Sequence, residues 1–205
     1  MREVVHFQPA WAKALKLGMV ASVSLTVGVA TSLLRGLGVP SPNVQLGGVG
    51  LIPIQSIGAL VAVAAMVYAL RSLDTAAQAS TERPCFAIIC LVGLAAAALP
   101  IALSWVFLDS VFPYSISYVR SVIGFLALAL LSWRLLGATL ASVTPLFALL
   151  IMGLLGRNPI SREPTWWAWG LVIQPWSGFW LLPVVILSVA GLWVSTIPMA
   201  DLRRG

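Results

Sequence analysis

Long apolar runs alternate with short polar segments along almost the whole chain. A helix needs about 20 mostly apolar residues to cross a hydrocarbon core about 30 Å thick, and six runs meet that requirement. None of the runs alternates apolar and polar positions as a barrel strand does, so we expect helices. The six predicted spans are Ala14–Leu34, Leu51–Leu70, Cys85–Leu108, Ile116–Leu136, Ala138–Leu155 and Gly178–Ile197.

The segment ahead of the first span, residues 1–13, has a different pattern. Val4, Phe7 and Trp11 recur at helical spacing, and the basic residues of the segment fall on the other side. This distribution is typical of a helix that lies in the membrane surface with its aromatic side chains at headgroup level. We therefore predict an interfacial helix here, with an irregular basic tail as the alternative.

Composition supports a membrane protein and argues against a soluble domain or a nucleic-acid-binding protein. Of the 205 residues, 60% are hydrophobic and 9% are charged, against roughly 25% charged in an average soluble domain. The net charge is +6, but the basic residues are scattered singly between apolar runs, which does not fit a nucleic-acid surface. The sequence thus predicts an all-α, polytopic fold in which residues 1–205 form a single transmembrane domain.

Lysine and arginine positions predict the orientation of the spans, because cytoplasmic loops carry an excess of both residues. If the N-terminus is cytoplasmic, eight basic residues fall inside and four fall outside or near the outer end of a span. Both termini are then cytoplasmic. The ten arginines against two lysines favour a bacterium with a GC-rich genome, and hence its plasma membrane.

The longest polar segment on the predicted cytoplasmic side joins the second and third spans. It carries both signs of charge, at Arg71, Asp74, Glu82 and Arg83. A short mixed-charge helix at this position would suit the docking of a soluble partner. A solvated turn without a partner is equally compatible with the residues.

Two features lie on the predicted outer side of the first four spans. The segment Gly36–Gln55 is rich in glycine and proline and almost free of charge, so we expect it to follow the membrane surface, where it need not have regular structure. Asp109 and Arg120 flank the start of the fourth span and form a candidate outer-face charge pair. Arg120 is close enough to the end of that span to extend its guanidinium toward water, and we expect this rather than a role in transport.

The last external loop is dense in tryptophan, which marks a membrane interface. We expect a short helical dip near residues 157–176 that anchors the chain in the outer leaflet, with ligand binding as the alternative. The residues of this external element are Arg162, Glu163, Trp166, Trp167, Trp169 and Trp176.

Small residues recur every four positions on the first span, at Gly18, Ser22, Thr26 and Ala30. Such a face lets another helix approach closely, so we predict that it packs against a helix. Three spans also contain a proline that removes a backbone hydrogen bond, at Pro100, Pro145 and Pro183.

The chain has no recognisable enzyme motif and almost none of the positioned titratable groups that catalysis normally needs. It has no metalloprotease or serine-hydrolase motif and no intramembrane pair of carboxylates. Cys85 and Cys90 are five residues apart on one predicted helix, so they cannot bridge each other and are expected to be small apolar side chains. We therefore expect no enzyme, no bound cofactor and no metal site, and any transport would draw its energy from a partner.

The layout as a whole resembles the membrane subunits of ATP-binding-cassette exporters of the drug and bacteriocin type. The shared features are the interfacial segment, six spans, the short charged segment after the second span and the external element before the last one. The resemblance implies that Arg71, Asp74, Glu82 and Arg83 contact a separate ATPase. It also implies that ATP is bound by that partner, that Pro159–Trp176 forms an external element, and that a second membrane subunit, identical or related, completes a path for a peptide, lipid or drug-like substrate.

Two alternatives remain open on the sequence. The chain is also similar in size and span number to the substrate-binding membrane subunit of an energy-coupling vitamin importer, in which Trp166, Trp167, Trp169 and Gly36–Gln55 would take part in a ligand pocket. A structural or assembly subunit of a larger membrane complex is the third class.

Overall fold

The computed structural model describes residues 10–45, 47–74, 83–107 and 111–173, together with Pro183 and Ile186. Helices dominate this part of the chain, and a single two-stranded sheet accompanies them. In chain order the elements are α1 (Ala10–Leu33), β1 (Gly38–Asn43), β2 (Gly48–Pro53), α2 (Ile54–Asp74), α3 (Arg83–Phe107), α4 (Phe112–Leu136), α5 (Ala138–Ala141), α6 (Thr144–Leu155) and a single 3-10 turn, η2 (Trp169–Leu171).

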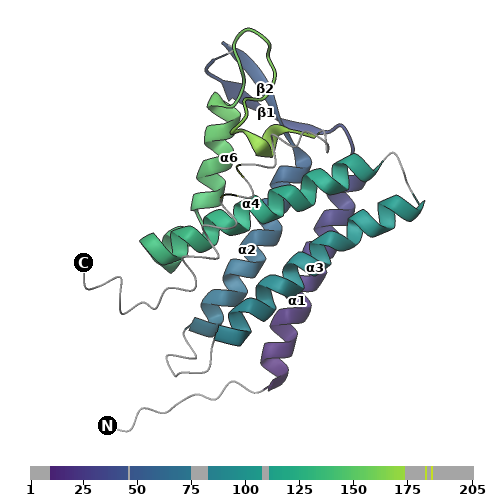
Figure 1. The fold of residues 1–205 in the computed structure, drawn as a ribbon, viewed down its shortest axis with the longest axis vertical. Helices are drawn as coiled ribbons and strands as arrows, with labels where there is room; N and C mark the ends of the chain where they lie inside the picture. Colours follow the sequence, from purple (N-terminus) through teal and green to yellow (C-terminus); the bar gives the residue numbers. More distant parts are fainter. Residues whose placement is uncertain are drawn as a thin grey trace.

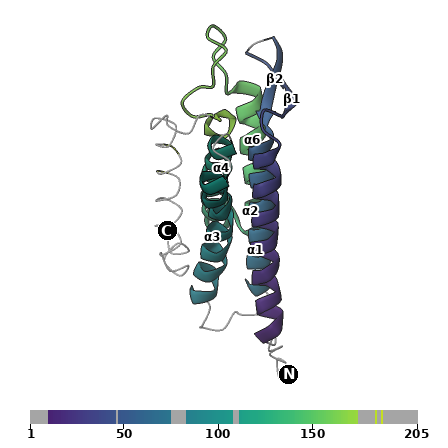
Figure 2. The same ribbon diagram turned by 90° about the vertical axis from the view of Figure 1, so that its right-hand side faces the viewer.

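The long helices form two layers. α1 and α2 run side by side in one layer, while α3 and α4 lie in the other and cross the first pair obliquely (Figures 1 and 2). α6, β1 and β2 gather at one end of this bundle, and the loop that follows α6 projects beyond it (Figure 2). We call this the hairpin end; the C-terminal end of α2 and the N-terminal end of α3 lie at the opposite end (Figure 1).

Within the described residues, three helices are long and apolar enough to cross a membrane. They lie in α1 (Lys16–Leu33), α2 (Ile54–Arg71) and α4 (Phe112–Trp133) and correspond to the first, second and fourth predicted spans. α3 covers the third predicted span up to Phe107 and contains the shorter apolar stretch Cys90–Leu103. The composition and length of these helices thus support the membrane class.

The fifth predicted span is divided into two helices. α4 ends where Gly137 adopts a left-handed φ of 92°, and α5 then contains only four residues. α6 begins at Thr144 with Pro145 in its first turn, where a missing N–H costs nothing, so the proline starts a helix instead of kinking one. At about 1.5 Å per residue, the twelve residues of α6 are shorter than a bilayer core.

Several predictions fall on residues outside the described part of the chain. These are most of the interfacial segment 1–13, most of the sixth span Gly178–Ile197, and the positions of both termini. Six spans and a cytoplasmic location of the termini therefore remain predictions.

Most of the glycine- and proline-rich segment, for which the sequence required no regular structure, forms a β-hairpin. β1 and β2 pair antiparallel, with Pro40 opposite Leu51 and Pro42 opposite Val49. The pairing continues beyond the strands, where Ile54 donates its N–H to the carbonyl of Leu37 at 3.3 Å. Because hydrogen-bonded and non-hydrogen-bonded pairs alternate in an antiparallel ladder, both prolines fall on non-bonded pairs.

Close helix contacts in the bundle depend on small residues. A Cβ added at Gly58 of α2 would lie 2.6 Å from the Cγ2 atom of Thr31 in α1, so only glycine permits this approach. α4 is the most enclosed candidate span, with 67% of its residues buried, and α2 follows with 56%. Only 28% of the α1 span is buried, which leaves one side of that helix uncovered by the described chain.

Candidate functional site

Polar side chains cluster inside the bundle toward the hairpin end. Ser56 of α2 and Ser117, Arg120 and Ser121 of α4 are all buried, and Arg120 is only 3% exposed. α4 directs its three residues to one place because positions three and four apart share a helix face. The hydroxyl groups of Ser56 and Ser121 lie 3.4 Å apart and link the two helices.

The side chains of this cluster donate hydrogen bonds to backbone carbonyl groups of the segment after α6. Ser56 donates its hydroxyl hydrogen to the carbonyl of Gly170. The carbonyl of Val172 accepts from the hydroxyl of Ser117 at 3.0 Å and from Nη2 of Arg120. A buried carbonyl without a hydrogen bond costs free energy, so these contacts favour the burial of this segment inside the bundle.

Trp169 is the apolar part of the same contact. Its side chain is 1% exposed, and its ring lies 4.8 Å from the ring of Phe125 at a tilt of 52°. The ring also covers Gly124 of α4, where an added Cβ would lie 2.4 Å from the ring atom Cη2. The polar cluster and Trp169 together close the hairpin end of the bundle; we call this arrangement the closure.

The closure corrects two expectations about the external residues. Arg120 does not extend to water but is buried against Val172. The predicted helical dip at 157–176 is, as far as the structure describes it, a loop followed by the three-residue turn η2, buried between helices. Asp109 lies outside the described residues, so its pairing with Arg120 stays a prediction.

The predicted external tryptophans have different environments. Trp166 is 56% exposed, Trp167 is half-buried against the core, and Trp169 is buried. Trp176 lies outside the described residues. Anchoring at an interface therefore suits Trp166, whereas Trp169 serves packing and is not accessible to a ligand in this state.

The hairpin is fastened to α6 and to the loop after it. Asn43 donates from Nδ2 to the carbonyl of Gly153 at 2.9 Å, and Val44 donates its N–H to the carbonyl of Leu154 at 3.1 Å. On the other strand, Nη2 of Arg157 donates to the carbonyl of Leu51 at 2.9 Å. The hairpin and the loop therefore form one unit at this end of the bundle.

The loop itself is a tight turn that displays charge. The N–H of Asn158 bonds the carbonyl of Glu163, the N–H of Arg162 bonds the carbonyl of Asn158, and both distances are 2.9 Å. Arg162 has a φ of 59°, in the left-handed region that side chains other than glycine rarely adopt. The side chains of Arg162 and Glu163 are exposed.

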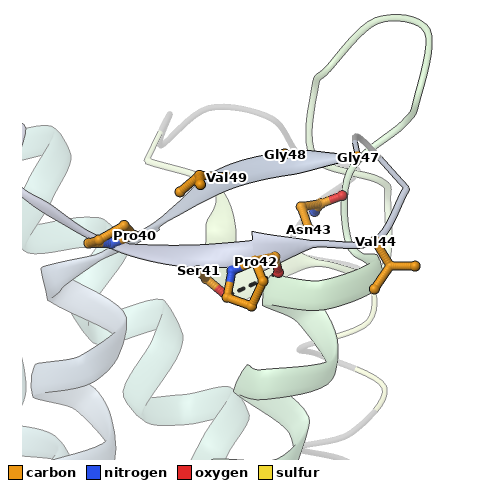
Figure 3. A pocket seen from close by; sticks show the side chains of 8 residues that line it. All are labelled: Pro40, Ser41, Pro42, Asn43, Val44, Gly47, Gly48 and Val49. Carbon is orange, nitrogen blue, oxygen red and sulfur yellow. Dashed lines mark hydrogen bonds between the residues drawn. The ribbon is translucent and has the colours of Figure 1, made fainter.

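Two shallow hollows flank β2. One, of about 460 Å³, lies over the turn end of the hairpin and is lined by residues of both strands, which Figure 3 shows from close by. The other, of about 370 Å³, lies between β2 and the loop; its lining is Gly48, Val49, Gly50, Leu51, Arg157 and Arg162.

Three of the four predicted ATPase-contact residues lie at the end opposite to the hairpin. Arg71 is exposed in the last turn of α2, Asp74 is the last residue of that helix, and Arg83 is the first residue of α3. Glu82 lies outside the described residues. The structure therefore brings the two helix ends to the same end of the bundle (Figure 1).

The small-residue face of α1 points away from the described bundle. Gly18, Ser22, Thr26 and Ala30 are all exposed. The buried side of the helix is offset by two residues and includes Val20, which is 0% exposed. Within the described chain, no helix packs on the predicted face.

Comparison with known protein families, with curated proteins and with solved structures finds no match to this chain.

Proposed function

We propose that the chain is a multi-pass permease subunit of an ATP-driven exporter in a bacterial plasma membrane. The observation that carries the proposal is the closure at the hairpin end. A translocation path needs an end that closes and can reopen, and the closure depends on a few hydrogen bonds that water can replace. Those bonds come from hydroxyl groups and one guanidinium group, namely Ser56, Ser117 and Arg120.

The scarcity of charged side chains in the described core supports a partner subunit as the source of energy for transport. Arg120 is the only charged side chain among the described residues that are buried. Coupling to protons or sodium ions normally uses carboxylates or histidines inside the membrane, and the described core contributes none. A separate ATPase is the partner that the layout of the sequence implies, and ATP would be bound there.

The ATPase contact belongs at the end opposite to the closure. Arg71, Asp74 and Arg83 lie at the ends of α2 and α3, and α2 also supplies Ser56 to the closure. A displacement of α2 by a partner would therefore act directly on a residue that holds the closure. This continuity supports the assignment of Arg71, Asp74, Glu82 and Arg83 as the coupling segment.

A second membrane subunit would cover the exposed face of α1. Gly18, Ser22, Thr26 and Ala30 allow the close approach of another helix and are exposed. The same observation favours one alternative, the substrate-binding subunit of a vitamin importer, which would place this face against a scaffold protein. The substrate of the exporter would be a peptide, a lipid or a drug-like molecule.

Purification from native membranes tests the proposal. We expect a stoichiometric ATPase to co-purify with the chain, and the double charge reversal Glu82→Lys, Arg83→Glu to abolish the association. Arg162→Glu, at the hairpin end, is the matched control and should retain the ATPase. Purification of the chain alone with a tightly held small ligand, or an ATPase that stays bound after the charge reversal, would contradict the exporter assignment.

A further inference from the structure

The backbone of β2 has a free edge beside a basic loop. Hydrogen-bonded and non-hydrogen-bonded pairs alternate along an antiparallel ladder. Because Leu37 and Ile54 form a hydrogen-bonded pair, the residues opposite Pro40 and Pro42 belong to non-hydrogen-bonded pairs. Val49 and Leu51, opposite Pro42 and Pro40, therefore direct their N–H and C=O groups away from β1. The contact of Arg157 with the carbonyl of Leu51 confirms that direction.

The two edges of the hairpin are not equivalent. On β1, Pro40 and Pro42 remove two successive outward N–H groups, and the next outward N–H toward the turn, that of Val44, is bonded to Leu154. Proline at such positions is a common protection of an edge against further pairing. β2 has no such protection at Val49, whose peptide group has no partner outside the hairpin among the described residues. An added strand therefore finds the better edge on β2.

The space beside this edge is open and lined with positive charge. The hollow of about 370 Å³ runs along Gly48–Leu51 and is bounded by Arg157 and Arg162. Arg157 uses Nη1 and Nη2 to bond the carbonyls of Arg162 and Leu51, at 3.2 and 2.9 Å. No ion pair of Arg162 with an acidic side chain is found in the described chain, although Glu163 is its neighbour in sequence.

From this juxtaposition we propose that the β2 edge binds the C-terminal end of an extended peptide, by strand addition, with its carboxylate at Arg157 and Arg162. Strand addition satisfies backbone groups through main-chain hydrogen bonds, and a carboxylate pairs well with guanidinium groups. The strand must end near Leu51, because Arg157 already occupies the carbonyl of that residue. The charged group of the ligand therefore belongs at its terminus.

The chemistry of Val49 separates a peptide from a bare anion. Its outward peptide group has both a donor and an acceptor. A phosphodiester group only accepts hydrogen bonds and can satisfy only the N–H, whereas a peptide backbone satisfies both. The outward side chains of Val49 and Leu51, 70% and 53% exposed, also provide apolar surface for the side chains of an added strand.

This inference extends the proposed function, since it names a peptide as the class of molecule bound at the hairpin end, but its test needs no ATPase. The full chain would be placed in nanodiscs of zwitterionic lipid, and the binding of a short fluorescent peptide with a free C-terminal carboxylate would be measured by anisotropy. We expect saturable binding that weakens about tenfold, roughly 1.4 kcal/mol, when the peptide is C-terminally amidated or when Arg162→Gln is introduced. Arg71→Gln, which removes a positive charge at the opposite end, should leave the affinity unchanged.

Two substitutions at one position test the strand itself. Val49→Pro removes the outward N–H without removing a ladder bond and should abolish binding, whereas Val49→Thr keeps the N–H and should bind normally. Binding that survives Val49→Pro would overturn the proposal. A preference for anionic vesicles over the peptide would also overturn it. So would disulfide cross-linking between two copies of the Val49→Cys variant if the peptide does not decrease the yield of cross-linked product. Peptide binding without a co-purifying ATPase would leave this site standing and reject the exporter; the reverse result would reject the site alone.

Discussion

Gly124 of α4 gives the sharpest test of the closure. In the substitution Gly124→Ala, the new Cβ would lie 2.4, 2.7 and 2.8 Å from the ring atoms Cη2, Cζ3 and Cζ2 of Trp169. Carbon atoms in contact are normally about 3.5–4.0 Å apart, so the ring has to move by about 1 Å. The ring has little room to do so, because it is 1% exposed and lies against Phe125.

The size of the effect follows from a comparison with a second glycine. Overpacking of this kind costs about 1–3 kcal/mol, but alanine also gains up to about 1 kcal/mol over glycine in a helix interior. Gly18→Ala in α1 is the matched control, because nothing lies within 4 Å of its added Cβ. The helix gain cancels in the difference between the two variants, which should therefore be about 1–3 kcal/mol.

The assay is thermal unfolding of the full chain in detergent. At about 2–4 °C per kcal/mol, the midpoint of Gly124→Ala should lie roughly 2–12 °C below that of Gly18→Ala. Labelling of a cysteine at Ala168, a position that is 0% exposed, gives a second readout, and it should be faster in the Gly124→Ala background.

A double-mutant cycle decides whether the ring of Trp169 is responsible. In a Trp169→Leu background the obstructing ring is absent, so Gly124→Ala should cost much less than in the parent chain. If Gly124→Ala costs the same in both backgrounds, or if it matches Gly18→Ala in the parent chain, the packing of Trp169 on α4 is not as described here.

Three further substitutions probe other contacts. Arg120→Ala removes a charge-assisted hydrogen bond to the buried carbonyl of Val172, worth about 1.5–3 kcal/mol, and should lower the unfolding midpoint more than Arg120→Lys does; equal midpoints would contradict this role. Arg157→Ala removes the hydrogen bond to the carbonyl of Leu51, so amide hydrogen exchange should accelerate in the external loop but not in the core of α2. Unchanged exchange in the loop would show that this hydrogen bond does not stabilise it. Ser22→Leu, on the exposed side of α1, should change stability by less than about 0.5 kcal/mol while reducing cross-linking between subunits in membranes; unaltered cross-linking would exclude this face as the contact.

The length of the apolar runs was sufficient to predict the long helices of the described chain. The fourth predicted span ends at Leu136, as α4 does, because Gly137 stops the helix at a left-handed φ. The start was predicted four residues late, at Ile116, since Pro113 in the first turn is compatible with an earlier beginning at Phe112. Local sequence determines such boundaries, which is why they can be read from it.

The hairpin could not be predicted from composition because glycine and proline usually oppose strands. The informative feature was spacing, since Pro40 and Pro42 are two residues apart and so share one edge of a strand. The roles of Arg120 and Trp169 depend on distant partners. Val172 is 52 residues beyond Arg120, and the space that Trp169 fills is created by the missing side chain of Gly124. Neither relation leaves a trace in the local pattern.

The contact between Arg120 and Val172 also imposes an order on biosynthesis. An arginine at the centre of an inserting helix costs roughly 2.5–3.5 kcal/mol at the translocon, which is the upper value for Arg120 because it lies in the first half of α4. The carbonyl partner of Arg120 is encoded 52 residues later. At a synthesis rate of about 5–20 residues per second, roughly 3–10 s pass before the ribosome adds Val172. During that interval only the burial of the apolar residues of α4 in lipid can offset the cost of inserting Arg120. The hairpin end acquires its final hydrogen bonds only after the downstream chain has emerged.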